Sequence, residues 1–158
     1  MPIVTISRGS YSRGKEVAEK VADRLGYECV SREILVEASA EFNVPEVGLL
    51  HAIEKAPSIL DRFTFGKERY VAYVQAALLE HLQRDNIVYH GLAGHFFVRT
   101  IPHVLKVRII ADMADRAKLL MAREGIANED EALHSIRGID EARRKWGLHL
   151  YGIDTHDP

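Results

Sequence analysis

The feature that most constrains the fold is a glycine-bounded loop between a short apolar run and an amphipathic segment. Residues 9–16 read GSYSRGKE and follow the β-branched run 3–6, which is typical of a buried parallel strand. After Lys15 the apolar residues recur at helical spacing, and Gly26 stands where the helix is predicted to end. A strand, a glycine loop and a helix in this order match the context of the phosphate-binding pattern G-x-x-x-x-G-K-[ST].

This loop predicts a phosphate-binding site. Glycines let the backbone turn so that its N–H groups point inward, and the following helix adds its positive N-terminal end. We expect the Lys15 ammonium to reach the β- and γ-phosphates of a nucleotide. The alternative is a chance glycine–lysine turn. The residues predicted to bind the nucleotide are Gly9, Ser10, Tyr11, Ser12, Arg13, Gly14, Lys15 and Glu16.

Glu16 departs from the pattern, because a serine or threonine hydroxyl normally coordinates magnesium at that position. Its carboxylate could bind the metal through an oxygen, or it could repel the nucleotide phosphates. It could also point away and cap the helix, where an anionic side chain is favourable by about 0.3 to 1 kcal/mol. The sequence leaves these three alternatives open.

The rest of the chain alternates predicted strands with predicted helices. Further strands are expected at residues 27–30, 87–89 and 104–111, and further helices at residues 33–42, 68–84, 112–123 and 128–148. This order favours βαβ units with right-handed crossovers. We therefore predict an α/β fold of three αβα layers around a parallel sheet of at least four strands.

The length of 158 residues indicates one domain, residues 1–158, with a P-loop kinase-like organisation. Its core is predicted at residues 1–44 and 67–124. Residues 45–66 contain Pro57 and mixed polarity, so they are predicted to form an irregular or short-helical excursion of the kind that covers a substrate. Residues 125–158 are predicted to form a helical lid.

A second group of charged residues lies in this last predicted helix. Arg137, Asp140 and Arg144 have spacings that place them on one helical face. Guanidinium groups bind phosphate oxygens in bidentate fashion, so such a helix could close over bound phosphates and expel water. The alternative is a solvated charged face with helical salt bridges. We assign catalytic roles to Lys15, Arg137 and Arg144 and substrate binding to Asp140.

Two further segments are candidates for substrate binding. Arg32 follows the second predicted strand and could grip the phosphate of an accepting nucleotide, or form a surface pair with Glu33. His90 and Gly91 follow the third predicted strand, at the carboxyl edge where ligands bind in open α/β sheets. A metal role for His90 and His95 is not favoured, because no third ligand has a convincing spacing. No metal-binding residue is predicted.

Charge and targeting features narrow the range of partners. The formal net charge of -2 gives no overall basic field for a nucleic-acid backbone, so a small-molecule partner is favoured. The single cysteine, Cys29, cannot form an internal disulfide, which fits a reducing compartment. No apolar run reaches about 18 residues, and no signal peptide is evident. We expect a cytoplasmic protein that binds neither nucleic acid nor a membrane.

With these residues assembled, the chain resembles the cytidylate kinase-like family of P-loop proteins, which are related to nucleoside monophosphate kinases. The similarity spans nearly the whole chain and rests on the blocks VTISRGSYSRGKEVAEKVADRLGY, SREIL, HGLAGH, RTIPHVLKVRIIA, DRAKLLMAREGI and RGIDEARRKWGLHLYG. The resemblance implies transfer of the terminal phosphate of ATP to a nucleoside monophosphate with magnesium. By position, residues 9–16 would hold donor phosphates, and Arg32 would approach the acceptor. The excursion 45–66 would bind the nucleoside monophosphate, and Arg137, Asp140 and Arg144 would belong to the lid.

The sequence departs from this family at the third-strand turn, which commonly begins Gly-Arg-Gly where this chain has His90, Gly91 and Leu92. One expected positive group is thereby removed. Family members usually continue past the lid into another strand, so we expect the sheet to lack its last strand. Either the chain is naturally short, or it has been shortened, or a partner chain supplies the missing edge, and an unpaired edge would invite association with a second copy. The main hypothesis is a kinase acting on CMP or dCMP. The alternative is a catalytically degenerate, nucleotide-binding regulatory module, which Glu16 and the missing arginine favour.

Overall fold

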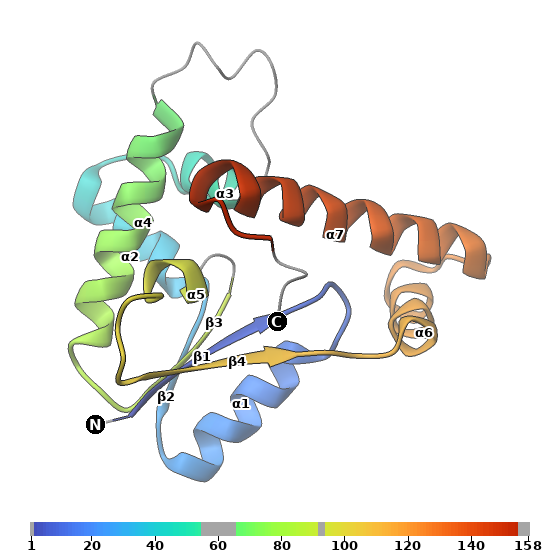
Figure 1. Ribbon diagram of the computed structural model, residues 1–158, viewed down its shortest axis with the longest axis horizontal. Coiled ribbons are helices and arrows are strands. Elements are labelled where there is room, and N and C mark those ends of the chain that lie inside the picture. Colours follow the sequence, from blue (N-terminus) through green and yellow to red (C-terminus); the bar gives the residue numbers. More distant parts are fainter. Residues whose placement is uncertain (1, 55–65, 92–93, 155–158) are drawn as a thin grey trace.

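The computed structural model describes residues 2–54, 66–91 and 94–154 of the chain (Figure 1). Its elements follow one another in the order β1 (Ile3–Arg8), α1 (Gly14–Leu25), β2 (Glu28–Val30), α2 (Glu33–Phe42), α3 (Glu46–Glu54), α4 (Gly66–Leu82), β3 (Ile87–His90), α5 (Gly94–Phe97), β4 (Val104–Ile109), α6 (Met113–Glu124) and α7 (Glu129–Tyr151). None of the helices within these ranges has both the length and the apolarity needed to cross a membrane.

Four strands form one parallel sheet in the order β2-β3-β1-β4. Ile6 of β1 lies opposite His90 of β3 and Val107 of β4. Because all strands run in the same direction, their carboxyl ends meet at one edge of the sheet. The predicted α/β fold with a parallel sheet of at least four strands is confirmed. Among the described residues β4 pairs with β1 alone, so it forms an open edge.

One face of the sheet is covered by α1. Val4, Ile6 and Val88 point to this face and pack against Ala18 and Ala22. The small alanine side chains let the helix lie close to the strands. Residues at every second position of a strand share a face, so this packing fixes which residues of β1 and β3 face α1.

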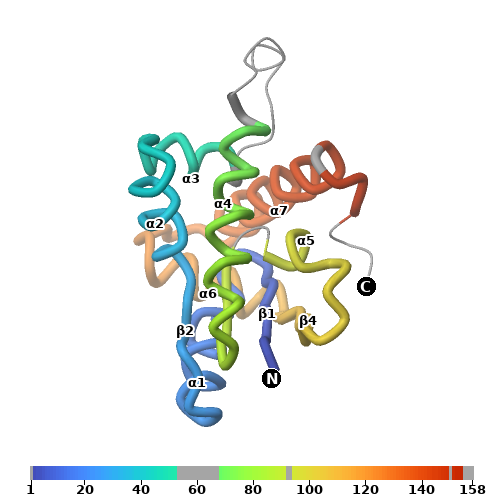
Figure 2. The backbone as a smooth tube through the Cα atoms, turned by 90° about the vertical axis from the view of Figure 1, so that its left-hand side faces the viewer, coloured from blue at the N-terminus to red at the C-terminus, as the bar shows by residue number. Residues whose placement is uncertain are grey.

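The opposite face carries the larger core. Ile3, Ile87 and Val104 contribute from the strands, and α2, α3 and α4 pack side by side over them (Figure 2). Trp146 brings α7 onto the same core, where its indole Nε1 donates a hydrogen bond to the carbonyl of Ala52 at 2.8 Å. The C-terminal helix is therefore attached to α3.

α7 also packs against α6, beyond the end of β4 (Figure 1). Ala117 and Leu120 of α6 and Ala132 and Ile136 of α7 are all buried in one small cluster. Asn128 begins α7 by accepting hydrogen bonds from the N–H groups of Asp130 and Glu131, as a capping residue does. The predicted start of this helix at Asn128 is confirmed.

One predicted segment differs from the structure. The segment after β3 was expected to be a turn, but it contains the four-residue helix α5, whose Phe96 and Phe97 are buried. Phe96 stacks on Tyr151 with ring centroids 4.8 Å apart. The segment 45–66, predicted to be irregular or short-helical, contains the short helix α3, and its residues 55–65 lie outside the described residues.

Replacing Gly94 with alanine is expected to destabilise the protein by about 1 to 3 kcal/mol, as overpacking does. A Cβ at Gly94 would lie 2.2 Å from Cε1 and 2.4 Å from Cδ1 of the buried Tyr89 ring. Gly138→Ala is the matched control, because nothing lies within 4 Å of its Cβ position and alanine favours the helix by about 0.5 to 1 kcal/mol. Urea unfolding measures both. Equal stabilities of the two variants would contradict this packing.

Candidate functional site

The loop between β1 and α1 has an unusual backbone conformation. Tyr11 and Arg13 both adopt left-handed angles, with φ of 55° and 56°, and α1 begins immediately afterwards at Gly14. A left-handed angle costs a non-glycine residue roughly 1 to 2 kcal/mol, so surrounding contacts must hold the loop in place. Left-handed residues that alternate in this way turn successive N–H groups toward one side and form an anion-binding nest.

A buried arginine from α6 supplies those contacts. Arg116 donates from Nε to the carbonyl of Ser10 at 2.6 Å and from Nη2 to the Ser10 hydroxyl at 2.7 Å. Its guanidinium also lies against Gly9, where a Cβ would be only 3.2 Å from Cζ. Within the loop, the Ser12 hydroxyl donates to the carbonyl of Gly9 at 2.9 Å. Arg116 of α6 therefore holds the loop in place, and we call the contacts that hold Ser10 the clamp.

Asp140 of α7 completes this clamp. One carboxylate oxygen accepts from Arg116 Nη2 at 2.5 Å, and the other accepts from the Ser10 hydroxyl at 2.9 Å and from the Ser10 N–H at 3.3 Å. Burial alone would raise the pKa of the Asp140 carboxyl, but the hydrogen bonds from Arg116 and Ser10 outweigh it and hold the pKa below its ordinary value of 3.8. The charged pair thus joins the loop to both α6 and α7.

The clamp predicts a specific acid sensitivity. A carboxyl whose pKa is lower in the folded than in the unfolded chain stabilises the fold fully above the unfolded value, and this stabilisation is lost as the pH falls through the folded value. We expect Asp140→Asn to be less stable than the wild type by a constant amount between about pH 5 and pH 7. Below about pH 4 the difference should shrink. Urea unfolding across this range measures it, and a difference that stays constant at low pH would contradict the prediction.

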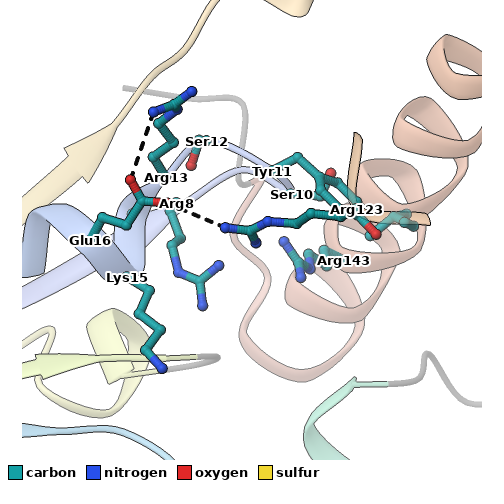
Figure 3. A pocket seen from close by; sticks show the side chains of 11 residues that line it. Arg8, Ser10, Tyr11, Ser12, Arg13, Lys15, Glu16, Arg123 and Arg143 are labelled. Atoms are coloured by element: carbon teal, nitrogen blue, oxygen red, sulfur yellow. Dashed lines mark hydrogen bonds and ion pairs between the residues drawn. The ribbon is translucent and has the colours of Figure 1, made fainter. Parts of the chain in front are cut away.

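A cavity of about 250 Å³ opens beside the loop (Figure 3). It is lined by Arg8, Ser10, Tyr11, Ser12, Arg13, Gly14, Lys15, Glu16, Arg123, Ile139 and Arg143. Five of these side chains are cationic and one is acidic. A concave site with an excess of one charge concentrates ligands of the opposite charge. The cavity is thus suited to a ligand with several negative charges.

Glu16 is held by two of the arginines. Its carboxylate lies 3.3 Å from Nη2 of Arg123 and 3.8 Å from Nη1 of Arg13, as the dashed lines in Figure 3 mark. It also stands in the first turn of α1, where a negative charge is favourable. The carboxylate lines the cavity and no side-chain hydrogen bond from the described residues caps α1, so Glu16 pairs with arginines instead of pointing away to cap the helix. In the described parts of the chain, no three acidic, histidine or cysteine side chains are grouped to hold a metal ion.

Lys15 and Arg8 extend from the two ends of the loop in the same direction (Figure 3). The Lys15 side chain is 67% exposed, and its Nζ lies 3.6 Å from a carboxylate oxygen of Glu19 one turn along α1. An exposed helical ion pair of this kind is weak. Lys15 is therefore able to leave Glu19 when a more highly charged ligand enters the cavity.

The arginines of the predicted lid helix differ in their position relative to the cavity. Arg143 lines the cavity, whereas Arg137 is exposed and does not. Arg144 makes a two-pronged contact with Glu141 at 2.8 and 2.9 Å and a further contact with Asp154 at 3.2 Å. Arg143, Arg8, Arg116 and Arg123 were not among the predicted site residues. Two of them had a signal in the sequence, because Arg8 directly precedes Gly9 and Arg143 belongs to the charged group of the last predicted helix.

The other predicted substrate residues lie in different surroundings. Arg32 is exposed, and its Nε lies 3.0 Å from a carboxylate oxygen of Glu46 at the start of α3. His90 is buried at the carboxyl end of β3, and its Nδ1 has no hydrogen-bond partner among the described residues. Gly91 packs tightly, since a Cβ there would lie 2.7 Å from the Tyr89 hydroxyl.

Comparisons with known proteins give one family and several structures. The family model that matches is that of the cytidylate kinase-like family, over residues 3–158. No curated protein matches the sequence. Among solved structures, an uncharacterized protein from Eubacterium ventriosum is similar, with a TM-score of 0.72 and 19% identity over 99% of this chain and 82% of that chain. This likeness shows that the two chains share a fold.

Two solved kinases are more distant. A gluconokinase from Sinorhizobium meliloti has a TM-score of 0.48 and 15% identity, over 87% of this chain and 74% of its own. A shikimate kinase from Acinetobacter baumannii, solved in complex with shikimate, has a TM-score of 0.47 and 14% identity, over 92% of this chain and 79% of its own.

Proposed function

We propose that this chain, which belongs to the cytidylate kinase-like family, transfers the terminal phosphate of ATP to a nucleoside monophosphate, with CMP or dCMP as the acceptor. The observation that carries this proposal is the cationic cavity beside the left-handed loop at the start of α1. Residues of the loop, the start of α1 and five cationic side chains line this cavity, and backbone N–H groups at a helix N-terminus favour an anion. Such a site binds a phosphate chain.

The loop residues 9–15 hold the donor in this proposal. Their N–H groups bind the β- and γ-phosphates, and the mobile ammonium of Lys15 follows the γ-phosphoryl group as it moves. An oxygen of the acceptor phosphate attacks the γ-phosphorus, the bond to the β,γ-bridging oxygen breaks, and ADP leaves with the electron pair. The protein accelerates this step by fixing the reactants and stabilising negative charge, with no covalent intermediate.

In this proposal α7 acts as the lid, at least over the described residues 129–151. Arg143 is the lid arginine that reaches the cavity, and Asp140 one turn earlier fixes the helix to the loop. Arg123 at the end of α6 adds a second guanidinium at the same rim. Bidentate contacts from these groups would draw α7 over the phosphates and reduce their exposure to water.

Magnesium would enter with ATP. The cationic cavity fits the phosphates well, but Glu16, the acidic residue of its lining, is already paired with Arg13 and Arg123. The residues present therefore fit a metal held mainly by phosphate oxygens and water, as magnesium commonly is. When bound, the ion would neutralise charge on the β- and γ-phosphates.

A coupled assay that follows ADP release tests the proposal. The purified chain is incubated with ATP, magnesium and each of a panel of monophosphates: CMP, dCMP, UMP, AMP and GMP. We expect turnover to be fastest with CMP or dCMP. A parallel thermal-shift experiment measures ATP binding alone, since ligand at about a hundred times its Kd stabilises the fold by about 2.7 kcal/mol. If ATP stabilises the fold but no acceptor gives turnover, the proposed kinase activity is wrong and the chain is a nucleotide-binding regulatory module.

A further inference from the structure

On the face of the sheet that packs against α1, the side chains are apolar along the strands and polar at the carboxyl edge. Along β1 the residues on this face are Val4, Ile6 and then Arg8, and along β3 they are Val88 and then His90. Ile6 lies directly opposite His90, so Arg8 stands one pleat further toward the carboxyl edge on the neighbouring strand. An apolar surface thus ends in two polar groups on the same face.

Arg8 lacks an anionic partner within the described part of the chain. No ion pair is formed by its guanidinium there, and its buried Nε has no hydrogen-bond acceptor. The side chain is pressed against the start of α1, because a Cβ on Gly14 would lie 2.1 Å from Cδ of Arg8. Burial lowers the pKa of the Arg8 guanidinium, and the positive charge of the nearby Arg123 lowers this pKa further. A half-buried cation without a counter-ion is unfavourable, and an anionic ligand would relieve that cost.

His90 lies beside this cation and is itself only 4% exposed. Burial, followed by the charge of Arg8, lowers the pKa of His90, so its imidazole is neutral near pH 7. Its Nδ1 is buried and has no partner among the described residues. A neutral imidazole in this position can exchange one hydrogen bond with a ligand without competing with Arg8 for the negative charge.

We infer that Arg8 binds the phosphate monoester of the acceptor, with His90 beside it, in the same cavity that the donor loop lines. The inference rests on the function proposed above. The guanidinium fork matches two phosphate oxygens, and it protrudes from β1 between Lys15 on one side and Arg123 and Arg143 on the other (Figure 3). A cation in that place offsets the repulsion between two phosphate groups that must approach each other for transfer.

The test is equilibrium binding by calorimetry, with the full chain and each nucleotide alone. The probes are ATP, the panel of five monophosphates, and the nucleoside of whichever monophosphate binds most tightly. In the wild type we expect the monophosphate to bind at least about tenfold more tightly than its nucleoside. Arg8→Gln should remove this preference while changing the Kd for ATP by less than about threefold. Arg8→Lys should recover part of the affinity, because it keeps the charge but not the fork.

Arg24→Gln is the matched control, since this exposed arginine lies in the last turn of α1. It should leave both affinities unchanged. Thermal melting shows which variants are folded, and Arg8→Lys carries the test if Arg8→Gln does not fold. The inference is overturned if both folded Arg8 variants bind the monophosphate as the wild type does, or if ATP affinity falls as much as monophosphate affinity. Unchanged monophosphate binding in the Arg8 variants would overturn the inference and leave the proposed function standing. Wild-type binding of ATP but of no monophosphate would overturn the proposed acceptor as well, and binding of a monophosphate without ATP would overturn the proposed donor site alone.

Discussion

Lys15→Ala is expected to lower kcat for phosphate transfer from ATP by about a hundredfold to a thousandfold, the usual cost of removing one group that stabilises transition-state charge. The ammonium extends freely from the first turn of α1, with only an exposed pair to Glu19 at 3.6 Å. Its removal should therefore change the fold little and the chemistry greatly. Initial rates with ATP and the best acceptor measure the effect, and thermal melting confirms that the variant is folded.

Two further variants test whether the fall in kcat comes from the lost positive charge of Lys15. Lys15→Arg keeps the positive charge and should recover part of the activity. Lys20→Ala removes an exposed lysine from the same helix and should leave kcat within about twofold of the wild type. A rate for Lys15→Ala close to that of the wild type would remove this residue from the mechanism.

Arg116→Met is expected to destabilise the protein by about 3 kcal/mol, as breaking a buried charge pair does. The substitution leaves the Asp140 carboxylate, which is 23% exposed in the wild type, without its cation. It also removes the hydrogen bonds that hold the carbonyl and hydroxyl of Ser10. For a chain of this length the melting temperature should fall by roughly 6 to 12 °C.

The double variant Arg116→Met with Asp140→Leu distinguishes a buried charge from general packing. Removing both charges leaves no unpaired carboxylate, so the double variant should be more stable than the sum of the two single changes predicts. Lys118→Met, at an exposed position on the same helix, should change stability by less than about 0.5 kcal/mol. Urea unfolding provides all four values. Additive single and double changes would show that Arg116 and Asp140 do not act as a pair.

The order of strands and helices could be predicted from the sequence because each element has a strong local pattern. The predicted helix 33–42 has the same bounds as α2, and Gly26 ends α1 in a left-handed conformation as predicted. The helix α5 was missed because four residues are too few to show helical periodicity. Its position depends on the aromatic packing of Phe96 with Tyr151, which lies far away in the sequence.

The candidate site was predictable only in its local part. The loop could be recognised because its glycines and its lysine all lie in the one short segment 9–15. Its clamp could not, because Ser10, Arg116 and Asp140 are separated by up to 130 residues. Which face of α7 turns inward is decided by packing of Ala132 and Ile136 against α6, so charge spacing alone does not identify the lid arginine that reaches the cavity. Alternation along β1 would have placed Arg8 on the α1 face.

The central claim is that the backbone of residues 9–15 binds the phosphates of a nucleotide. The most direct measurement is a titration of the isotopically labelled protein with ATP, followed by the amide resonances of each residue. We predict that the amides from Ser10 to Lys15 move most, together, and saturate with a single Kd, and that pyrophosphate moves the same amides. If ATP saturates shifts of amide resonances in another part of the molecule, while the resonances of Ser10 to Lys15 do not move, the account is contradicted.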